Sequence, residues 1–100
     1  MSVYILLSKL TTEGRKTIKE RPGRMREVRA EYESVGVKVL EQYATLGPYD
    51  FVSVIEAPDN ETVGQVSVEL CSRGTIEIMT LAAIPVDSYI SALKSAKKVK

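Results

Sequence analysis

The first strand-length segment of the chain, residues 3–10, is apolar on both of its faces. A strand with one solvated face alternates apolar and polar residues, whereas a strand covered on both sides is apolar throughout. The side chains that would share one face are Val3, Ile5 and Leu7, and those of the other are Tyr4, Leu6 and Leu10. The sequence therefore predicts a central strand in a sheet that is covered on both sides.

Helical patterns occupy three parts of the chain before the last predicted strand. Thr11 can cap a helix that reaches about Glu20, and Pro22 interrupts it because proline has no amide hydrogen to donate. A second helix continues to about residue 36, and its apolar stripe consists of Met25, Val28, Tyr32 and Val35. Asp59 can cap a third helix that ends near residue 74. The stripe of this third helix consists of Val63, Val66 and Leu70.

Three further strands are predicted, at residues 37–46, 49–57 and 75–84. Gly47 and Pro48 between the first two of these form a strong turn signal, so we expect an antiparallel hairpin there. After the last strand, a short C-terminal helix would turn Ile90 and Leu93 inward.

The order of these elements, strand-helix-strand-strand-helix-strand, predicts an α+β fold of the ferredoxin-like βαββαβ class. Its four-stranded antiparallel sheet would carry the helices on one face. The third strand nevertheless has Val52 and Val54 on one side and Phe51 and Ile55 on the other, and an exposed sheet face this apolar is unusual. We therefore expect two copies to pair through their sheets, as in dimeric α/β barrels. The 100 residues suit one domain, with an ordered core at about 2–93 and a polar tail at 94–100.

The hairpin carries a recognisable motif, Gly47-Pro48-Tyr49-Asp50, within the stretch TLGPYDFV. Together with the stretches at residues 4–20 and 54–62 and the proline-interrupted helix, it makes the chain resemble the GYD-domain family of small bacterial and archaeal proteins. The likeness extends over residues 3–84. It implies a ferredoxin-like domain and a homodimer, and it implies no particular activity.

The candidate binding residues lie on the hairpin and on the strands beside it: Lys9, Tyr43, Tyr49, Asp50 and Glu56. Asp50 can accept backbone amides across the hairpin, with Tyr49 packing against its edge. Alternatively, both could form the polar rim of a pocket. Glu56 shares strand parity with Asp50, and Lys9 could neutralise either carboxylate. These alternatives stay open at the level of sequence.

Charge is distributed unevenly along the chain. Residues 1–38 carry nine basic and five acidic side chains, residues 39–93 carry one and eight, and residues 94–100 carry four basic ones. The densest basic run, from Arg15 to Arg29, is interleaved with glutamates, which indicates a solvated helix face. Aromatic residues are too few on the strands for an RNA-stacking surface, so we expect no nucleic-acid partner.

Several kinds of chemistry lack their usual residues. The sequence contains no histidine and a single cysteine, Cys71. A catalytic relay through imidazole, a histidine-ligated metal site and an intrachain disulfide are therefore excluded. No glycine-rich phosphate loop or membrane-spanning segment occurs. We expect a cytoplasmic protein with no metal, no cofactor and no catalytic residue, and with no membrane association.

These observations favour a non-catalytic homo-oligomeric module that binds a small molecule or serves in assembly or sensing. The alternative is an enzyme of the dimeric α/β-barrel class that acts on a small organic substrate without a cofactor. A pocket holding a ligand would favour binding or catalysis, whereas a solid core would favour assembly.

Overall fold

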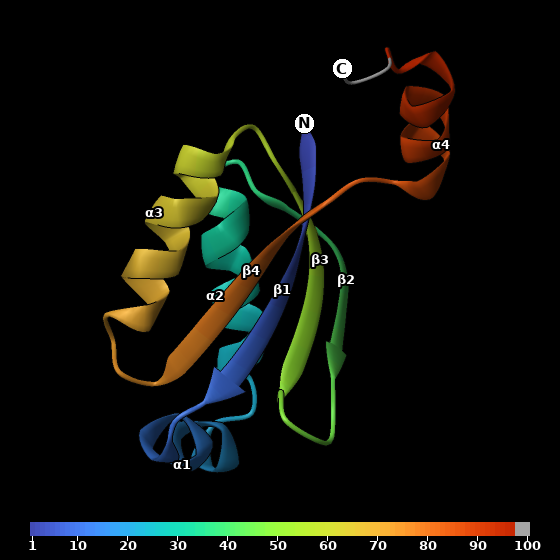
Figure 1. Cartoon of the computed structure of the whole chain (residues 1–100). Helices are drawn as coiled ribbons and strands as arrows, with labels where there is room; N and C mark the ends of the chain where they lie inside the picture. The colour runs from blue at the N-terminus through green and yellow to red at the C-terminus, as the bar shows by residue number, and fades with distance from the viewer. Residues whose placement is uncertain (98–100) are drawn as a thin grey trace.

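The computed structural model describes residues 1–97. In chain order its elements are β1 (Ser2–Leu10), α1 (Thr12–Glu20), α2 (Arg24–Ser34), β2 (Lys38–Ala44), β3 (Phe51–Ala57), α3 (Asn60–Cys71), β4 (Ile76–Ala83) and α4 (Val86–Ser95). The sheet has the order β2-β3-β1-β4, and all neighbouring strands are antiparallel. Helices α2 and α3 lie on one side of the sheet, and α1 lies at the end of β1 (Figure 1). The predicted ferredoxin-like α+β fold is confirmed, with β1 in a central position.

Two local signals set the starts of helices as expected. The Thr11 hydroxyl accepts the amide of Gly14 at 3.1 Å, and the Asp59 carboxylate accepts the amide of Thr62 at 2.8 Å. Each bond satisfies an amide that has no partner inside its helix. Pro22 lies in the turn between α1 and α2, so the predicted interruption is also confirmed.

Strand alternation divides the sheet into a helix-facing side and an open side. On the helix-facing side Tyr4 pairs with Ile55 and Leu6 with Ser53, and all four residues are buried. The hydrophobic core consists of Tyr4, Leu6, Tyr32, Val37, Val39, Ile55, Ala57, Val63 and Leu70. Val35, expected on the core stripe of α2, is instead exposed, because it follows the last turn of the helix.

The C-terminal helix differs from the expectation. Ile90 is 44% and Leu93 59% exposed, and α4 has no buried residue. The chain leaves β4 in an extended conformation at Pro85, which carries α4 away from the sheet (Figure 1). The radius of gyration of 15.8 Å accordingly exceeds the roughly 13 Å of a compact domain of this length. The prediction that Ile90 and Leu93 face inward is therefore wrong for the single chain.

None of the helices within residues 1–97 has both the length and the hydropathy needed to cross a bilayer. The sequence-based expectation of a polar tail concerns residues 94–100. Of these, Lys94 and Ser95 end α4, and residues 98–100 lie outside the described residues.

Candidate functional site

The Gly47-Pro48-Tyr49-Asp50 motif joins the hairpin to the central strand. Gly47 has a φ of 124°, a conformation that favours glycine because a Cβ would be strained there. The Asp50 carboxylate accepts the amide of Leu10 at 2.7 Å, and the Asp50 amide donates to the carbonyl of Ser8 at 2.8 Å. The sequence suggested that this carboxylate bonds across the hairpin. Its amide partner lies on β1 instead, because β3 pairs with β1 on the side away from β2.

Replacement of Asp50 by alanine is expected to lower the free energy of unfolding by about 1–2 kcal/mol, because the amide of Leu10 loses its acceptor. Asp50→Asn keeps an acceptor oxygen at the same place and serves as the matched control, with a much smaller loss. Urea denaturation of the two variants and the wild type measures the difference. An Asp50→Ala protein as stable as the wild type would show that this bond contributes nothing.

Four of the five sequence-predicted binding residues lie at the open side of the sheet. Lys9 pairs with Glu77, Tyr43 with Val52, and Glu56 with Val3, so these side chains share the open parity. The Tyr49 hydroxyl lies 3.6 Å from the sulfur of Met79, which belongs to the same side. The Asp50 carboxylate is bonded to the backbone amide of Leu10 on β1. The other four residues lie along one surface, the open side of the sheet.

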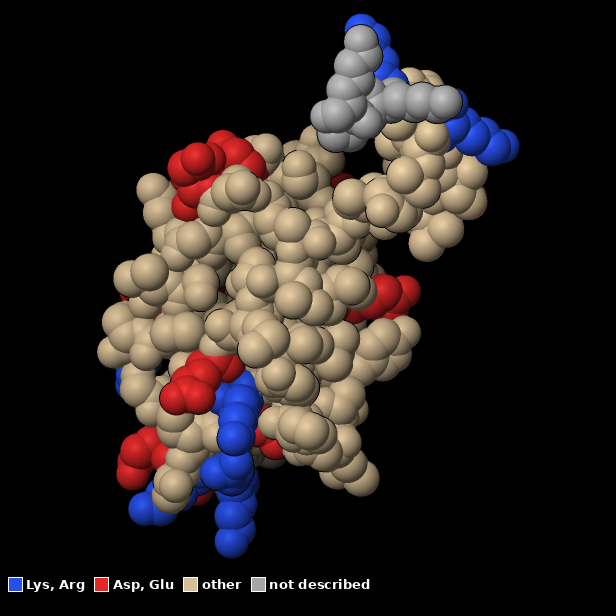
Figure 2. Space-filling model, in the orientation of Figure 1, with Lys and Arg blue, Asp and Glu red and all other residues tan. Residues whose placement is uncertain are grey.

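The centre of this open side is apolar. The side chains that compose it are Val3, Ile5 and Leu7 of β1, Val52 and Val54 of β3, and Met79 and Leu81 of β4. Charged groups surround them, among them the pairs Lys9–Glu77 and Lys38–Glu56 across neighbouring strands. In Figure 2 the surface over the strands is largely free of charge, and charged side chains gather at the margins. An apolar centre with a polar rim is the anatomy of a protein interface.

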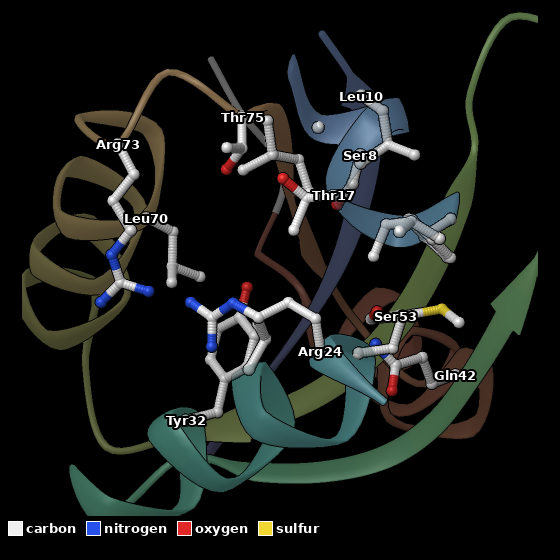
Figure 3. A pocket seen from close by; sticks show the side chains of 16 residues that line it. Ser8, Leu10, Thr17, Arg24, Tyr32, Gln42, Ser53, Leu70, Arg73 and Thr75 are labelled. Carbon is white, nitrogen blue, oxygen red and sulfur yellow. The ribbon is translucent and has the colours of Figure 1, made fainter. Parts of the chain in front are cut away.

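A cavity of about 130 Å³ lies on the other side of the sheet, between the strands and helices α1, α2 and α3. None of the five predicted binding residues lines it. Three of the residues that do are buried hydroxyl side chains, Ser8 of β1, Ser53 of β3 and Tyr32 of α2. Figure 3 shows them directed from their three elements toward the same space.

Sequence reasoning missed these cavity residues, although a signal for two of them exists. Ser8 stands between Leu6 and Leu10 on the helix-facing parity of β1, and Ser53 stands between Phe51 and Ile55 on that of β3. A serine on an otherwise apolar buried face indicates either that its hydroxyl forms a hydrogen bond there or that the packing is incomplete. Tyr32 gave no such signal, because tyrosine is ordinary on the stripe of a helix.

Ion pairs occupy the charged groups at the rim of the cavity. The Glu31 carboxylate accepts hydrogen bonds from the guanidinium groups of Arg24 at 3.1 Å and Arg73 at 3.0 Å. Both arginines line the cavity. The hydrogen bond from Arg73, assisted by the charges of both arginines, lowers the pKa of the Glu31 carboxyl. Arg24 also lies 3.1 Å from Glu27, and Arg73 lies 3.4 Å from Glu69, so each guanidinium is paired with two carboxylates of the chain itself.

The basic run on the first two helices is paired in the same way. Arg21 lies 2.7 Å from Glu27, and Arg29 lies 3.4 Å from Glu33. These pairs agree with the interpretation of the run as a solvated helix face. Within residues 1–97 no group of acidic, cysteine or histidine side chains is arranged to hold a metal ion.

Tyr32 is a titratable group that lines the cavity and is largely buried. Burial, and to a smaller extent the neighbouring Cys71 and Glu31, raises the pKa of Tyr32 to about 12. Its hydroxyl is therefore protonated at neutral pH and can donate as well as accept a hydrogen bond. The cavity thus offers hydroxyl groups in an apolar setting, and its lining contains no carboxylate, cysteine or lysine.

Comparison with known proteins gives one family and several relatives. The model of the GYD domain matches residues 4–93. A protein of Thermus thermophilus named "Glutamine synthetase and cystathionine beta-lyase binding protein" is 50% identical over 95 residues, which are 94% of this chain and 100% of that protein.

Solved structures with the same fold are more distant in sequence. The crystal structure of FFRP-DM1 is 22% identical, with a TM-score of 0.55 over 84% of this chain and 100% of that one. The crystal structure of another Thermus thermophilus protein is 23% identical, with a TM-score of 0.54 over 85% of this chain and 95% of that one. At these identities the likeness concerns the fold alone.

Proposed function

The chain belongs to the GYD domain family, and on that basis we propose that it is a non-catalytic, homo-oligomeric binding module with a protein partner and a small-molecule site. The observation that carries the proposal is the apolar open side of the sheet, together with the unpacked helix α4. The family match extends to Leu93, the last apolar residue of α4, so this helix lies within the matched extent of the domain.

Self-association is supported by the uncovered apolar surface. Strands of seven to nine residues in a four-stranded sheet present a face of roughly 500 Å², at about 3.3 Å per residue and 4.8 Å between strands. The apolar centre occupies part of that face, and the apolar stripe of α4 adds to it; exposed apolar patches of a few hundred Å² commonly mark interaction sites. The stripe consists of Val86, Tyr89, Ile90 and Leu93. A second copy carries the same two surfaces, so each chain can cover those of the other, as in a two-fold symmetric dimer.

Helix α4 supports the same proposal from its own stability. It has ten residues, and an isolated helix shorter than about 12 residues is marginal in water. Most helical stability in proteins comes from packing an apolar face against other elements. The apolar face of α4 has no such packing within the single chain. In the proposed dimer α4 packs against the partner. Ile90 and Leu93 are then buried, as the sequence predicted, but against the partner chain and not against their own.

The polar residues at the margin of the open side complete this interface. Lys9, Tyr43, Tyr49 and Glu56 would form its rim, and Asp50 would hold the hairpin in register beneath them. Rim groups of this kind determine orientation and the choice of partner more than affinity. The whole chain acts as one domain in this proposal. A cytoplasmic location suits its unpaired Cys71.

The protein partner is proposed from the relative that is 50% identical, whose name states that it binds glutamine synthetase and cystathionine beta-lyase. We expect this chain to bind glutamine synthetase or cystathionine β-lyase of the organism that encodes it. Size-exclusion chromatography at micromolar concentration tests this, with an unrelated enzyme of similar size as the control. Co-elution with at least one of the two enzymes is expected, and separate elution from both would contradict the proposed partner.

Binding is favoured over the alternative of a cofactor-independent enzyme by the lining of the cavity. The charged side chains there are Arg24 and Arg73, and both are held in ion pairs with Glu31, Glu27 and Glu69. General acid–base catalysis needs a group that can lose and regain a proton near neutral pH. The hydroxyl of Tyr32, with its pKa near 12, is poorly suited to that role.

A further inference from the structure

Three hydroxyl groups in the cavity have no hydrogen-bond partner within residues 1–97. Ser8 and Ser53 are each 5% exposed and Tyr32 is 6% exposed, and no side-chain hydrogen bond joins their hydroxyls to another described residue. No fully enclosed polar side-chain atom in the described part of the chain lacks a partner. The three hydroxyls therefore open onto the cavity itself. Hydroxyls that open onto a cavity in this way are free to bond a polar group of a molecule that occupies it.

The walls between these hydroxyls are mainly apolar, although Thr17, Gln42 and Thr75 also contribute polar side chains. They are formed by side chains from all three helices and from the sheet, among them Leu10, Ile18, Met25, Val28, Phe51 and Leu70. The volume of about 130 Å³ is close to that of a buried apolar cavity of about 150 Å³ that accepts a benzene ring. The cavity is thus sized for one small ring and could not take a nucleotide or a long acyl chain.

The charges at the rim argue for an uncharged occupant. Arg24 and Arg73 both bind Glu31, and Arg73 does so through two nitrogens. Arg24 also lies 3.1 Å from Glu27, and Arg73 lies 3.4 Å from Glu69, so the two guanidinium groups are matched by three carboxylates. An anion would have to displace a carboxylate, and a cation would meet two guanidinium groups. Neither arginine offers a free charge to the cavity.

We propose that this cavity binds an uncharged molecule with a single ring and one hydroxyl group, of the phenol class, whose hydroxyl bonds to Ser8, Ser53 or Tyr32. Each of these hydroxyls can donate and accept, so one of them can pair with a hydroxyl that does both. The remaining contacts come mainly from the apolar side chains of the walls. The inference rests on the small-molecule part of the proposed function and is independent of self-association.

Phenol and toluene form a matched pair of probes, because they have nearly the same shape and differ in the hydroxyl. Titration of each into the full chain, followed by NMR chemical shifts, measures the dissociation constants. Phenol is expected to bind saturably at millimolar concentration or below, at least tenfold more tightly than toluene. The shifted resonances should belong to cavity residues such as Met25 and Ile76.

Variants that remove one hydroxyl each identify the polar contact. At least one of Ser8→Ala, Ser53→Ala and Tyr32→Phe should weaken phenol binding tenfold or more and leave toluene binding unchanged. Ser91→Ala, on exposed α4, is the control and should change neither. Circular dichroism of each variant establishes that the fold is kept.

Equal affinity for phenol and toluene, absence of saturable binding, or full phenol affinity in all three variants would overturn the inference. If ordered water fills the cavity and phenol does not displace it, saturable binding is absent and the inference fails in the same way. Light scattering of the same samples reports the oligomeric state separately. A dimer that binds no phenol would therefore refute this site without refuting the proposed self-association.

Discussion

Replacement of Gly14 by alanine is expected to lower the free energy of unfolding by about 2–3 kcal/mol, as overpacking of a tightly packed contact does. A Cβ at this position would lie 1.9 Å from the carbonyl oxygen of Thr75. That oxygen also accepts the amide of Thr11 at 3.1 Å, which joins the start of α1 to the start of β4. Because the obstacle is a bonded backbone atom, it cannot move aside as a flexible side chain would. The helix must shift or lose this contact.

Gly64→Ala is the matched control for this prediction. Gly64 lies within α3, and a Cβ there would meet nothing within 4 Å. Alanine is favoured over glycine in a helix interior, so this variant should be about 0.5–1 kcal/mol more stable than the wild type. Urea denaturation of both variants measures the two effects, which have opposite signs. A Gly14→Ala protein as stable as the wild type would contradict the close approach of α1 to β4.

The second large effect is expected from Leu81→Glu, which should convert the proposed dimer into a monomer at micromolar concentration. Leu81 lies on the open side of β4, where it pairs with Ile5, and it is 42% exposed in the single chain. A charge there is solvated in the monomer but buried without a partner in the dimer. The symmetric dimer would bury two such charges, so we expect its dissociation constant to rise by more than about 100-fold.

Val68→Glu is the control, because it introduces the same change on a side chain of α3 that is 71% exposed. Sedimentation velocity should find this variant in the same state as the wild type, and circular dichroism should show that both variants are folded. If Leu81→Glu is folded and remains dimeric, the open side of the sheet is not the interface.

The order of the elements could be predicted from the sequence because its signals are local. Apolar alternation, the capping residues Thr11 and Asp59, and the interruption at Pro22 each depend on neighbours a few residues away. The central place of β1 followed from its two apolar faces. The expectation that both faces are covered is met within the chain on the helix side only, and the other side is where we place the partner.

The cavity and the direction of α4 could not be predicted, for a physical reason that they share. The spacing of Ile90 and Leu93 shows that α4 needs an apolar surface, but it does not show which chain supplies that surface. A cavity is a shortage of atoms where several elements meet, so no single segment encodes it. The only signal for the cavity in the sequence is that Ser8 and Ser53 fall at positions that face the helices. Asp50 was placed on the right turn, but its partner Leu10 is 40 residues away in sequence.

The central claim is that two copies cover each other's open sheet side and α4. Multi-angle light scattering of the wild-type chain at micromolar concentration tests this most directly. The account predicts a mass of twice 11.1 kDa, or a multiple of that dimer. A mass of 11.1 kDa across the micromolar range would contradict it, since the apolar sheet side and α4 would then both remain in water.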